Sequence, residues 1–311
     1  MHSSLMEELE TILSDQKRLE ELLILEKETR GFSREKLIFI GMANVANYYW
    51  CAIKSNIKSK KNELQFFQSY LADRLAYSLK LGYIDELPRS NEKLLEIGDQ
   101  ISLGDVEKLL KEKEKNVDGL SKENGEIASP ANVGLEINGE KVAVIDPNTS
   151  KEERSHLEEL YKSNGYRIVD LEEEPMLRGY LHEETKGEKY PSIRWNFNWS
   201  DYVIVGIPDG ITDSFVYEFK TTRSKFLFYY LKPVALTQAD IYGYFFERDN
   251  KRVQLYLVNE EEVKTFEDKT DKTKAIDTLR KFKELDNGST PFRPKEWKCK
   301  SCEFKEECKL F

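Results

Sequence analysis

Two acidic residues and a lysine in the second half of the chain have the types and spacing of a metal-dependent catalytic site. Asp209 ends a strand-like segment at a Pro-Asp-Gly turn, and Glu218-Phe219-Lys220 follows in the next such segment. Alternate side chains of a strand share a face, so Glu218 and Lys220 point the same way while Phe219 points into the core. Two carboxylates side by side repel each other unless a cation lies between them, which favours Mg²⁺ or Mn²⁺ bound by oxygen ligands.

Such a site would suit hydrolysis of a phosphodiester. A divalent metal lowers the pKa of a bound water, and an ammonium group can orient that water or stabilise charge that develops on the phosphate. His182, on a predicted helix, could supply a further, neutral ligand. Taken alone, the same residues also fit a solvated Glu–Lys pair on an edge strand, a simple turn aspartate and a structural histidine.

A basic segment, residues 219–239, follows the lysine and contains no acidic residue, although the net charge of the chain is −9. Its cations are Lys220, Arg223, Lys225 and Lys232, and its interleaved aromatic residues are Phe226, Phe228, Tyr229 and Tyr230. Cations combined with stacking surfaces favour binding of single-stranded nucleic acid, although some of these rings could belong to the core. Gln238 and Tyr242 come next, on one face of a predicted helix.

The four cysteines have the spacing of metal ligands. Cys299, Cys302 and Cys308 form a C-x2-C-x5-C pattern, and Cys51 lies far upstream. Zinc sites usually pair one CxxC with a second CxxC or with histidines, and neither occurs near Cys299. A four-cysteine iron–sulfur site is therefore favoured over zinc. Trp297 directly precedes this pattern and could shield the site from solvent.

The elements that must position these residues follow from periodicity and turn signals. Helices are predicted at residues 5–28, 33–51, 64–81, 178–184 and 234–248, with a charged helix inside 104–125. Asn138-Gly139 predicts a hairpin between 135–137 and 141–145, and Ser150 with Glu153 predicts a capped helix that ends at Gly165. Further strands are predicted at residues 166–171, 193–197, 202–207, 215–220 and 252–258. This order predicts an α/β fold with a mixed sheet flanked by helices.

Composition narrows the class of protein. The chain has 311 residues, of which 39% are hydrophobic and 34% charged. Its longest apolar stretch, residues 37–43, is far shorter than a membrane span, and its N-terminus lacks the pattern of a signal peptide. We therefore expect a cytoplasmic protein without a membrane partner. The acidic balance argues against a non-specific nucleic-acid coat protein but allows a local basic site.

The order of these motifs resembles the RecB-type branch of the PD-(D/E)xK nucleases with an iron–sulfur cluster, and most of all the CRISPR-associated RecB-like exonucleases. The resemblance implies a restriction-endonuclease-like mixed sheet, a helical N-terminal region and a C-terminal iron–sulfur segment. The corresponding division of the chain is 1–82 for the helical region with Cys51, 83–170 for an insertion, 171–290 for the nuclease core and 291–311 for the iron–sulfur segment. His182 follows Cys51 at a greater distance than the resemblance leads us to expect, which is the reason for placing an insertion there.

The resemblance also implies roles for individual residues. His182, Asp209, Glu218 and the Phe219 carbonyl would bind Mg²⁺ or Mn²⁺, with Lys220, Asp209 and Glu218 as the catalytic set. Gln238, Tyr242, Arg223 and Lys225 would support the site and bind DNA. A [4Fe–4S] cluster would be bound by Cys51, Cys299, Cys302 and Cys308.

The activity implied by the resemblance is metal-dependent exonuclease cleavage of single-stranded DNA ends, in CRISPR spacer acquisition or DNA-end processing. Its partners would be DNA and an integrase or other CRISPR adaptation proteins. Two alternatives remain open on the same residues. One is a structure-specific DNA endonuclease, and the other is a non-catalytic factor that binds DNA ends.

Overall fold

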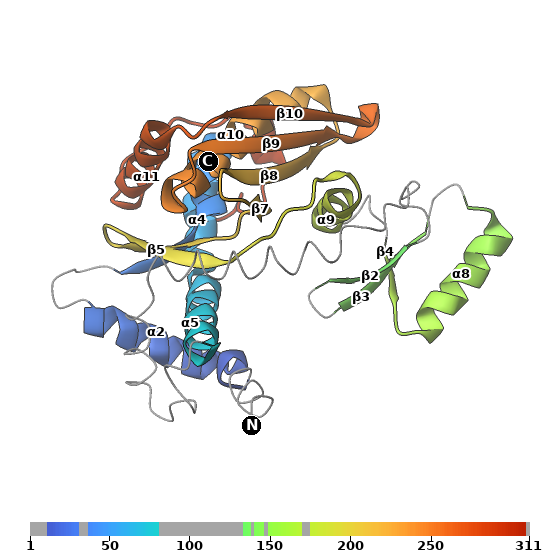
Figure 1. Cartoon of the computed structure of the whole chain (residues 1–311), viewed down its shortest axis with the longest axis horizontal. Helices are drawn as coiled ribbons and strands as arrows, with labels where there is room; N and C mark the ends of the chain where they lie inside the picture. The colour runs from blue at the N-terminus through green and yellow to red at the C-terminus, as the bar shows by residue number, and fades with distance from the viewer. Residues whose placement is uncertain are drawn as a thin grey trace.

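The computed structural model describes residues 11–30, 37–80, 133–137, 140–145, 149–169 and 175–308. Its strands form three sheets, with strand orders β1-β6-β5, β10-β9-β8-β7 and β2-β3-β4. In Figure 1 the first two sheets lie together with most of the helices, and the third lies to one side with α8. No helix among the described residues is long and apolar enough to cross a membrane.

The bounds of the elements are as follows. The α-helices are α2 (Gln16–Arg30), α3 (Met42–Ala46), α4 (Tyr48–Lys61), α5 (Glu63–Lys80), α8 (Lys151–Ser163), α9 (Pro175–Lys186), α10 (Lys225–Phe245), α11 (Lys272–Asp286) and α12 (Glu296–Lys300). The strands are β1 (Ile38–Gly41), β2 (Val133–Ile137), β3 (Glu140–Val144), β4 (Arg167–Val169), β5 (Trp195–Trp199), β6 (Tyr202–Gly206), β7 (Gly210–Ile211), β8 (Phe215–Thr222), β9 (Asn250–Leu257) and β10 (Glu262–Lys269).

The segment Ile38–Gly41 corrects one sequence prediction. We expected a helix over 33–51, but β1 is a strand that pairs in parallel with β6, and helix resumes only at Met42. Phe39 and Ile40 are both buried, on opposite faces of the sheet. A short apolar run that is buried on both faces has no alternation, so periodicity alone does not distinguish it from a buried helix.

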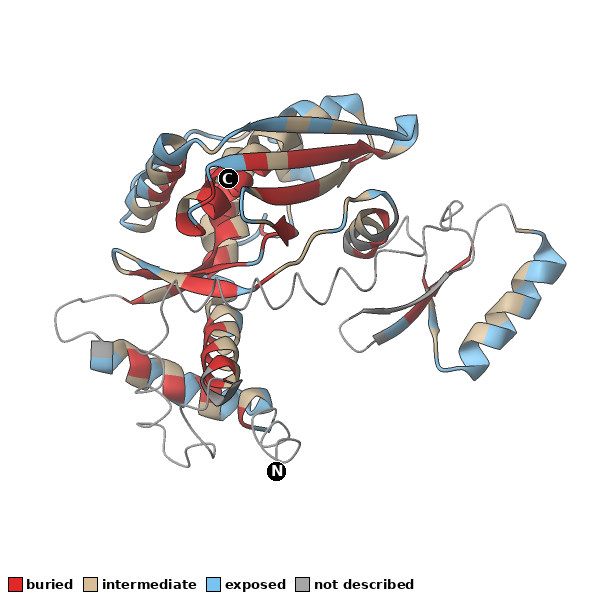
Figure 2. Cartoon of the chain, viewed as in Figure 1, coloured by how far each residue is buried: buried red, intermediate tan, exposed pale blue. Residues whose placement is uncertain are grey.

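Both faces of the β1-β6-β5 sheet are covered. Phe39 and Val203 pack on one face with residues of α2 and α5, including Leu22 and Leu71. Ile40 and Ile204 pack on the other face, in the largest core cluster, which also contains residues of α3, α10, α11, β8 and β9. Figure 2 shows this buried centre in red along β8, β9 and α10. The part of α10 from Val234 onward is therefore buried in a core cluster that it shares with both larger sheets.

Helix α10 begins nine residues earlier than predicted. Its N-terminal residue is Lys225 rather than a residue near 234, because the Ser224 side chain caps it by accepting a hydrogen bond from the Leu227 amide at 3.3 Å. Pro233 lies inside the helix, and a proline is the usual signal that a helix begins or breaks. The N-terminal part of the basic segment is thus helical. The elements β7, β10, α11 and α12 were not predicted either; the C-terminal segment, expected to be irregular, contains the short helix α12.

The third sheet follows the local sequence signals closely. Strands β2 and β3 pair as the predicted hairpin with Ile137 opposite Glu140, although Asn138-Gly139 itself lies outside the described residues. The Ser150 side chain caps α8 by accepting from the Glu153 amide at 3.3 Å, and Gly165 beyond the helix has a φ of +78°. Val144 and Leu181 belong to one buried cluster, which joins this sheet to α9. The charged helix expected inside 104–125 lies outside the described residues.

Candidate active site and cysteine cavity

The β7–β8 hairpin brings Asp209 beside Glu218. Gly210 and Ile211 pair with Tyr217 and Val216, so the residue before Gly210 lies level with Glu218. The Phe219 amide donates a hydrogen bond to Asp209 Oδ2 at 2.7 Å, and this bond fixes the aspartate on the strand that carries the glutamate. The structure therefore brings together the two carboxylates that the sequence singled out.

Lys220 completes this group. Its ammonium directly contacts Glu218 Oε1, as expected for two residues on the same face of one strand. Burial alone would lower the pKa of Lys220, but the charges of Glu218 and Asp209 raise that pKa above its ordinary value. The lysine therefore stays protonated and can serve as a fixed positive charge, not as a base.

Glu218 has the electrostatic character of a metal ligand. Its side chain is 0% exposed, and its Oε2 atom receives no hydrogen bond from the part of the chain that the structure describes. Burial and the neighbouring Asp209 raise the pKa of Glu218 well above its ordinary range, against the opposing effect of Lys220. A buried, crowded carboxylate is costly to ionise unless a cation compensates for it. These two carboxylates therefore fit a divalent metal ion.

Gln238 and Tyr242 hold the backbone of the turn that carries Asp209. Both are buried on α10, where Gln238 Nε2 lies 3.0 Å from the Tyr242 hydroxyl. That hydroxyl donates to the carbonyl of Ile207 at 2.8 Å, two residues before Asp209. Burial, followed by the charges of Glu218 and Asp209, raises the pKa of Tyr242 well above its ordinary value. In this structure the pair shapes the site from behind and does not line an exposed surface.

His182 lies on α9 and packs against an aromatic residue of β9. Its ring centroid is 5.0 Å from that of Tyr256, which lies opposite Thr221 in the β8–β9 register. Because side chains alternate along β8, Thr221 and Phe219 share the face opposite to the face of Glu218. Burial, helped by two nearby cations of α9, lowers the pKa of His182, so its imidazole is neutral near pH 7. No three His, Cys, Asp or Glu side chains of the described residues form a ready metal-binding group.

The neighbouring Glu183 was missed by the sequence analysis. Its charge raises the pKa of both Glu218 and Lys220, so it lies close enough to act on the site. Helix α9 packs on β8, where a Cβ atom added to Gly179 would lie 3.7 Å from Thr221 Oγ1. The sequence signal was weak, because a glutamate in a helix rich in charged residues is ordinarily solvated.

The comparisons with known proteins agree with this geometry. The family model for the PD-(D/E)XK nuclease superfamily matches residues 140–309, which include Asp209, Glu218 and Lys220. The chain belongs to the PD-(D/E)XK nuclease superfamily. Members of this superfamily are metal-dependent nucleases that use divalent ions such as Mg²⁺ or Mn²⁺.

No curated protein matches the chain. Among solved structures, the chain is similar to the one titled "Crystal structure of SSO0001", with 20% sequence identity and a TM-score of 0.34. The match covers 66% of this chain and 96% of that one.

The basic segment of this superfamily member divides into packed and exposed parts. Phe228 packs on the main core cluster, and the Lys232 ammonium lies 4.0 Å from the ring centroid of Phe266. Tyr229 is 73% exposed and Phe226 is 56% exposed. Lys225 is exposed as well, with its nearest carboxylate, that of Glu260, at 3.9 Å. Of the four aromatic residues predicted to stack on bases, Phe226 and Tyr229 are thus the exposed ones.

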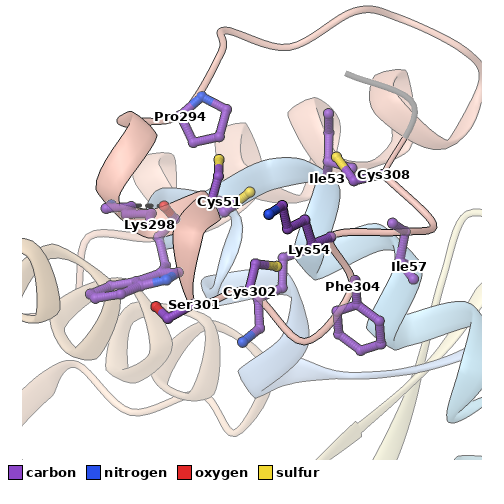
Figure 3. A pocket seen from close by; sticks show the side chains of 13 residues that line it. Cys51, Ile53, Lys54, Ile57, Pro294, Lys298, Ser301, Cys302, Phe304 and Cys308 are labelled. Atoms are coloured by element: carbon purple, nitrogen blue, oxygen red, sulfur yellow. Dashed lines mark hydrogen bonds between the residues drawn. The ribbon is translucent and has the colours of Figure 1, made fainter. Parts of the chain in front are cut away.

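All four cysteines line one cavity, which we call the cysteine cavity. Cys51 comes from α4, and Cys299, Cys302 and Cys308 come from the C-terminal segment, around a volume of about 120 Å³. Figure 3 shows Cys51, Cys302 and Cys308 around this space. None of the four is in a disulfide. Burial and the three other cysteines raise the pKa of the Cys299 thiol. The four sulfur atoms do not form a ready metal-binding group in this structure. Four thiols around one cavity are nevertheless a donor set that suits a metal, because a bound cation would relieve the repulsion between thiolates.

Proposed function

We propose that the chain is a metal-dependent deoxyribonuclease that degrades single-stranded DNA from its ends. The observation that carries the proposal is the hairpin that joins Asp209, Glu218 and Lys220, with one buried carboxylate oxygen left without a hydrogen bond. In a superfamily of metal-dependent nucleases, that arrangement supplies both the ligands for a divalent ion and a fixed cation beside it.

Asp209, Glu218 and the Phe219 carbonyl are the proposed ligands on the hairpin. When bound, a divalent ion supplies Lewis-acid activation of water and of the scissile phosphate. Lys220, held in its protonated form by the two carboxylates, orients the attacking water and stabilises charge on the phosphate oxygens. Tyr242 and Gln238 keep the turn before Asp209 in place, so the carboxylates are positioned before substrate arrives.

A further ligand is proposed from α9. His182 is the residue that the family resemblance selects, and its neutral imidazole suits a metal. Glu183 is the residue whose charge acts on Glu218 and Lys220 in this structure. His182→Ala and Glu183→Gln distinguish the two, because only loss of the true ligand should raise the Mn²⁺ concentration that half-maximal cleavage requires.

The substrate part of the proposal rests on the start of α10. The helix begins three residues after the end of β8 and presents Lys225, Phe226 and Tyr229 at its exposed surface. Exposed rings with cations and no acidic residue are suited to the bases and phosphates of a single strand. An activity that starts from ends predicts cleavage of linear single strands and no cleavage of circular ones.

The catalytic part is tested with Lys220→Ala and Glu218→Gln. In each variant the Mg²⁺- or Mn²⁺-dependent cleavage rate should be at least about 100-fold lower than in the native protein, while the circular dichroism spectrum stays that of the folded protein. Lys269→Ala, which replaces an exposed lysine of β10, is the control and should cleave normally. Retained cleavage by both site variants would remove these residues from the mechanism. Binding of DNA ends without any cleavage by the native protein would instead indicate an assembly factor.

We further propose that the cysteine cavity binds a [4Fe–4S] cluster and that the nuclease acts with an integrase in CRISPR spacer acquisition. The four free cysteines around one cavity support the first part, and the family resemblance supports the second. Anaerobically purified protein should be brown and contain iron and sulfide. A colourless protein loaded with zinc would overturn the cluster assignment. Co-purification with an integrase would support the CRISPR role.

A further inference from the structure

Lys298 occupies the boundary between the cysteine cavity and an aromatic cluster. It lies between Trp297 and Cys299 in the sequence, and it lines the cavity together with all four cysteines. Its ammonium donates a hydrogen bond to the carbonyl of Trp50 at 2.8 Å. Figure 3 shows the side chain beside the cavity. The cation is therefore held in place and is not a freely moving surface charge.

Three aromatic rings surround this ammonium. Its nitrogen lies 4.4 Å from the ring centroid of Trp50, 4.7 Å from that of Tyr230 and 5.6 Å from that of Trp297. Trp297 also packs on Tyr230 and Phe226 of α10, with ring centroids 5.1 and 5.2 Å apart. Cation–π contacts of this kind favour the charged form of this half-buried lysine. The same contacts connect the cysteine segment to the start of α10.

The other two lysines of the cavity are placed differently. Lys54 forms an ion pair with Glu303 at 2.8 Å, so its charge is already compensated. Lys305 is exposed, so water screens its charge. Among the described residues, no ion pair joins Lys298 to a carboxylate, and of the three lysines that line the cavity it is the one next to a cysteine in the sequence.

A four-thiolate site is stabilised by such a cation. Four thiolates carry more negative charge than a zinc ion or an oxidised four-iron cluster can neutralise, so the loaded site is an anion with either metal. In a partly buried site, an anion is stabilised by a nearby positive charge much more than it would be in water.

We propose that Lys298 is a positioning residue that compensates the charge of the four-thiolate site and couples that site to the start of α10. The proposal rests on the proposed metal site at the cysteines. In this proposal the aromatic residues fix the position of the Lys298 ammonium. The ammonium in turn helps to retain the metal group. It also raises the reduction potential of a cluster, because the reduced cluster is the more negative form.

The test compares Lys298→Met, Lys298→Arg and Lys305→Met, each purified anaerobically. Methionine keeps much of the apolar stem and removes the charge, arginine keeps the charge, and Lys305→Met is the matched exposed control. Three quantities are measured: the metal and sulfide content per chain, the rate of metal loss to an excess of chelator, and, for an iron-loaded protein, the midpoint potential of the cluster.

We expect Lys298→Met to lose its metal about tenfold faster than the native protein and to have a more negative midpoint potential. Lys298→Arg should restore most of both properties, and Lys305→Met should behave like the native protein. If the native protein contains zinc, the rate of metal loss alone carries the test. If Lys298→Met does not fold, Lys298→Gln takes its place.

The possible failures are distinguishable. A native protein without any metal at the cysteines would overturn the metal site and this inference with it. A loaded native protein whose Lys298→Met variant has the same rate of loss and the same potential would overturn only the role of Lys298. A Lys298→Arg variant as defective as Lys298→Met would show that shape and not charge matters, and this would also overturn the proposal.

Discussion

At the scale of single residues, Glu218 is suited to binding a metal ion but destabilises the metal-free folded protein near neutral pH. It is fully buried, next to Asp209, and its pKa is raised by that burial above the ordinary value of 4.5. A group whose pKa is higher in the folded protein than in the unfolded chain binds more protons when folded. Its contribution to stability is therefore largest at low pH and is lost as the pH rises through the folded value.

Replacing Glu218 with Gln should therefore stabilise the metal-free protein near pH 7. The expected gain is roughly 1–3 kcal/mol, the usual cost of an uncompensated buried polar group, and it should shrink as the pH falls toward the ordinary glutamate pKa. Urea unfolding in EDTA at several pH values measures this difference. Addition of Mg²⁺ should then stabilise the native protein and leave the variant unchanged. A variant that is less stable at pH 7 in EDTA would show that Lys220 fully compensates the carboxylate.

The structure also explains which site residues could be predicted from the sequence. Asp209, Glu218 and Lys220 were recognisable because a turn and a strand place them by local geometry alone. Glu183 was not, because its proximity to Glu218 depends on how α9 packs on β8. The position of His182 against Tyr256 depends on the same packing. Contacts between distant elements are set by tertiary structure, which local patterns do not specify.

At the scale of elements, the hydrogen bonds from α10 to the turn before Asp209 can be tested separately from the metal ligands. Tyr242→Phe removes the hydroxyl that joins Gln238 to the Ile207 carbonyl. We expect a loss of about 1 kcal/mol in unfolding free energy and a several-fold lower cleavage rate. Thermal unfolding and single-turnover cleavage measure the two effects. Tyr244→Phe on the same helix is the control. Unchanged cleavage by Tyr242→Phe would separate this contact from catalysis.

The start of α10 makes a second prediction at this scale, about binding of single-stranded DNA. Phosphate contacts release counterions, so each lost contact lowers the slope of log affinity against log salt by about 0.7. Arg223→Ala with Lys225→Ala should therefore lower that slope by about 1.4. Lys232→Ala should change it less, because Lys232 lies over Phe266. Fluorescence anisotropy with a labelled single strand at several salt concentrations measures the slopes. If the double variant and the native protein have equal slopes, the DNA backbone does not contact Arg223 and Lys225.

The elements themselves could be predicted where the signal is local. The hairpin of β2 and β3 and the cap of α8 follow from a few adjacent residues. The strand β1 and the early start of α10 did not follow from such signals. The strand β1 is specified by its pairing with β6 and not by an alternation of polar and apolar residues. In α10, packing against both larger sheets allows the helix to continue through Pro233.

At the scale of the whole molecule, the C-terminal segment returns to the helix that carries Cys51. Lys54 and Lys61 of α4 form ion pairs with Glu303 and Glu307. These pairs are largely exposed, so each contributes at most about 1 kcal/mol. Ion pairs this weak contribute little to the free energy that keeps the C-terminal segment packed against α4. A metal group at the cysteine cavity would join α4 to the C-terminal segment through metal–sulfur bonds.

Cys51→Ser tests this whole-molecule role. A cross-link that closes a loop of roughly 250 residues stabilises the folded chain by about 5 kcal/mol in the chain-entropy estimate, and by less if the unfolded chain is compact. We expect a lower unfolding temperature, faster proteolysis within residues 291–308, and loss of bound metal. Limited proteolysis followed by mass spectrometry locates the cleavage.

The replacement should leave Mg²⁺ binding at Asp209 and Glu218 intact at temperatures where the protein stays folded, since the hairpin is held by its own strands. Ser55→Ala, on the same helix, is a control for loss of a buried hydrogen bond without loss of a thiolate. If Cys51→Ser keeps both its metal content and its unfolding temperature, Cys51 is not a ligand. The C-terminal segment would then be held by α4 and the aromatic contacts of Trp297 alone.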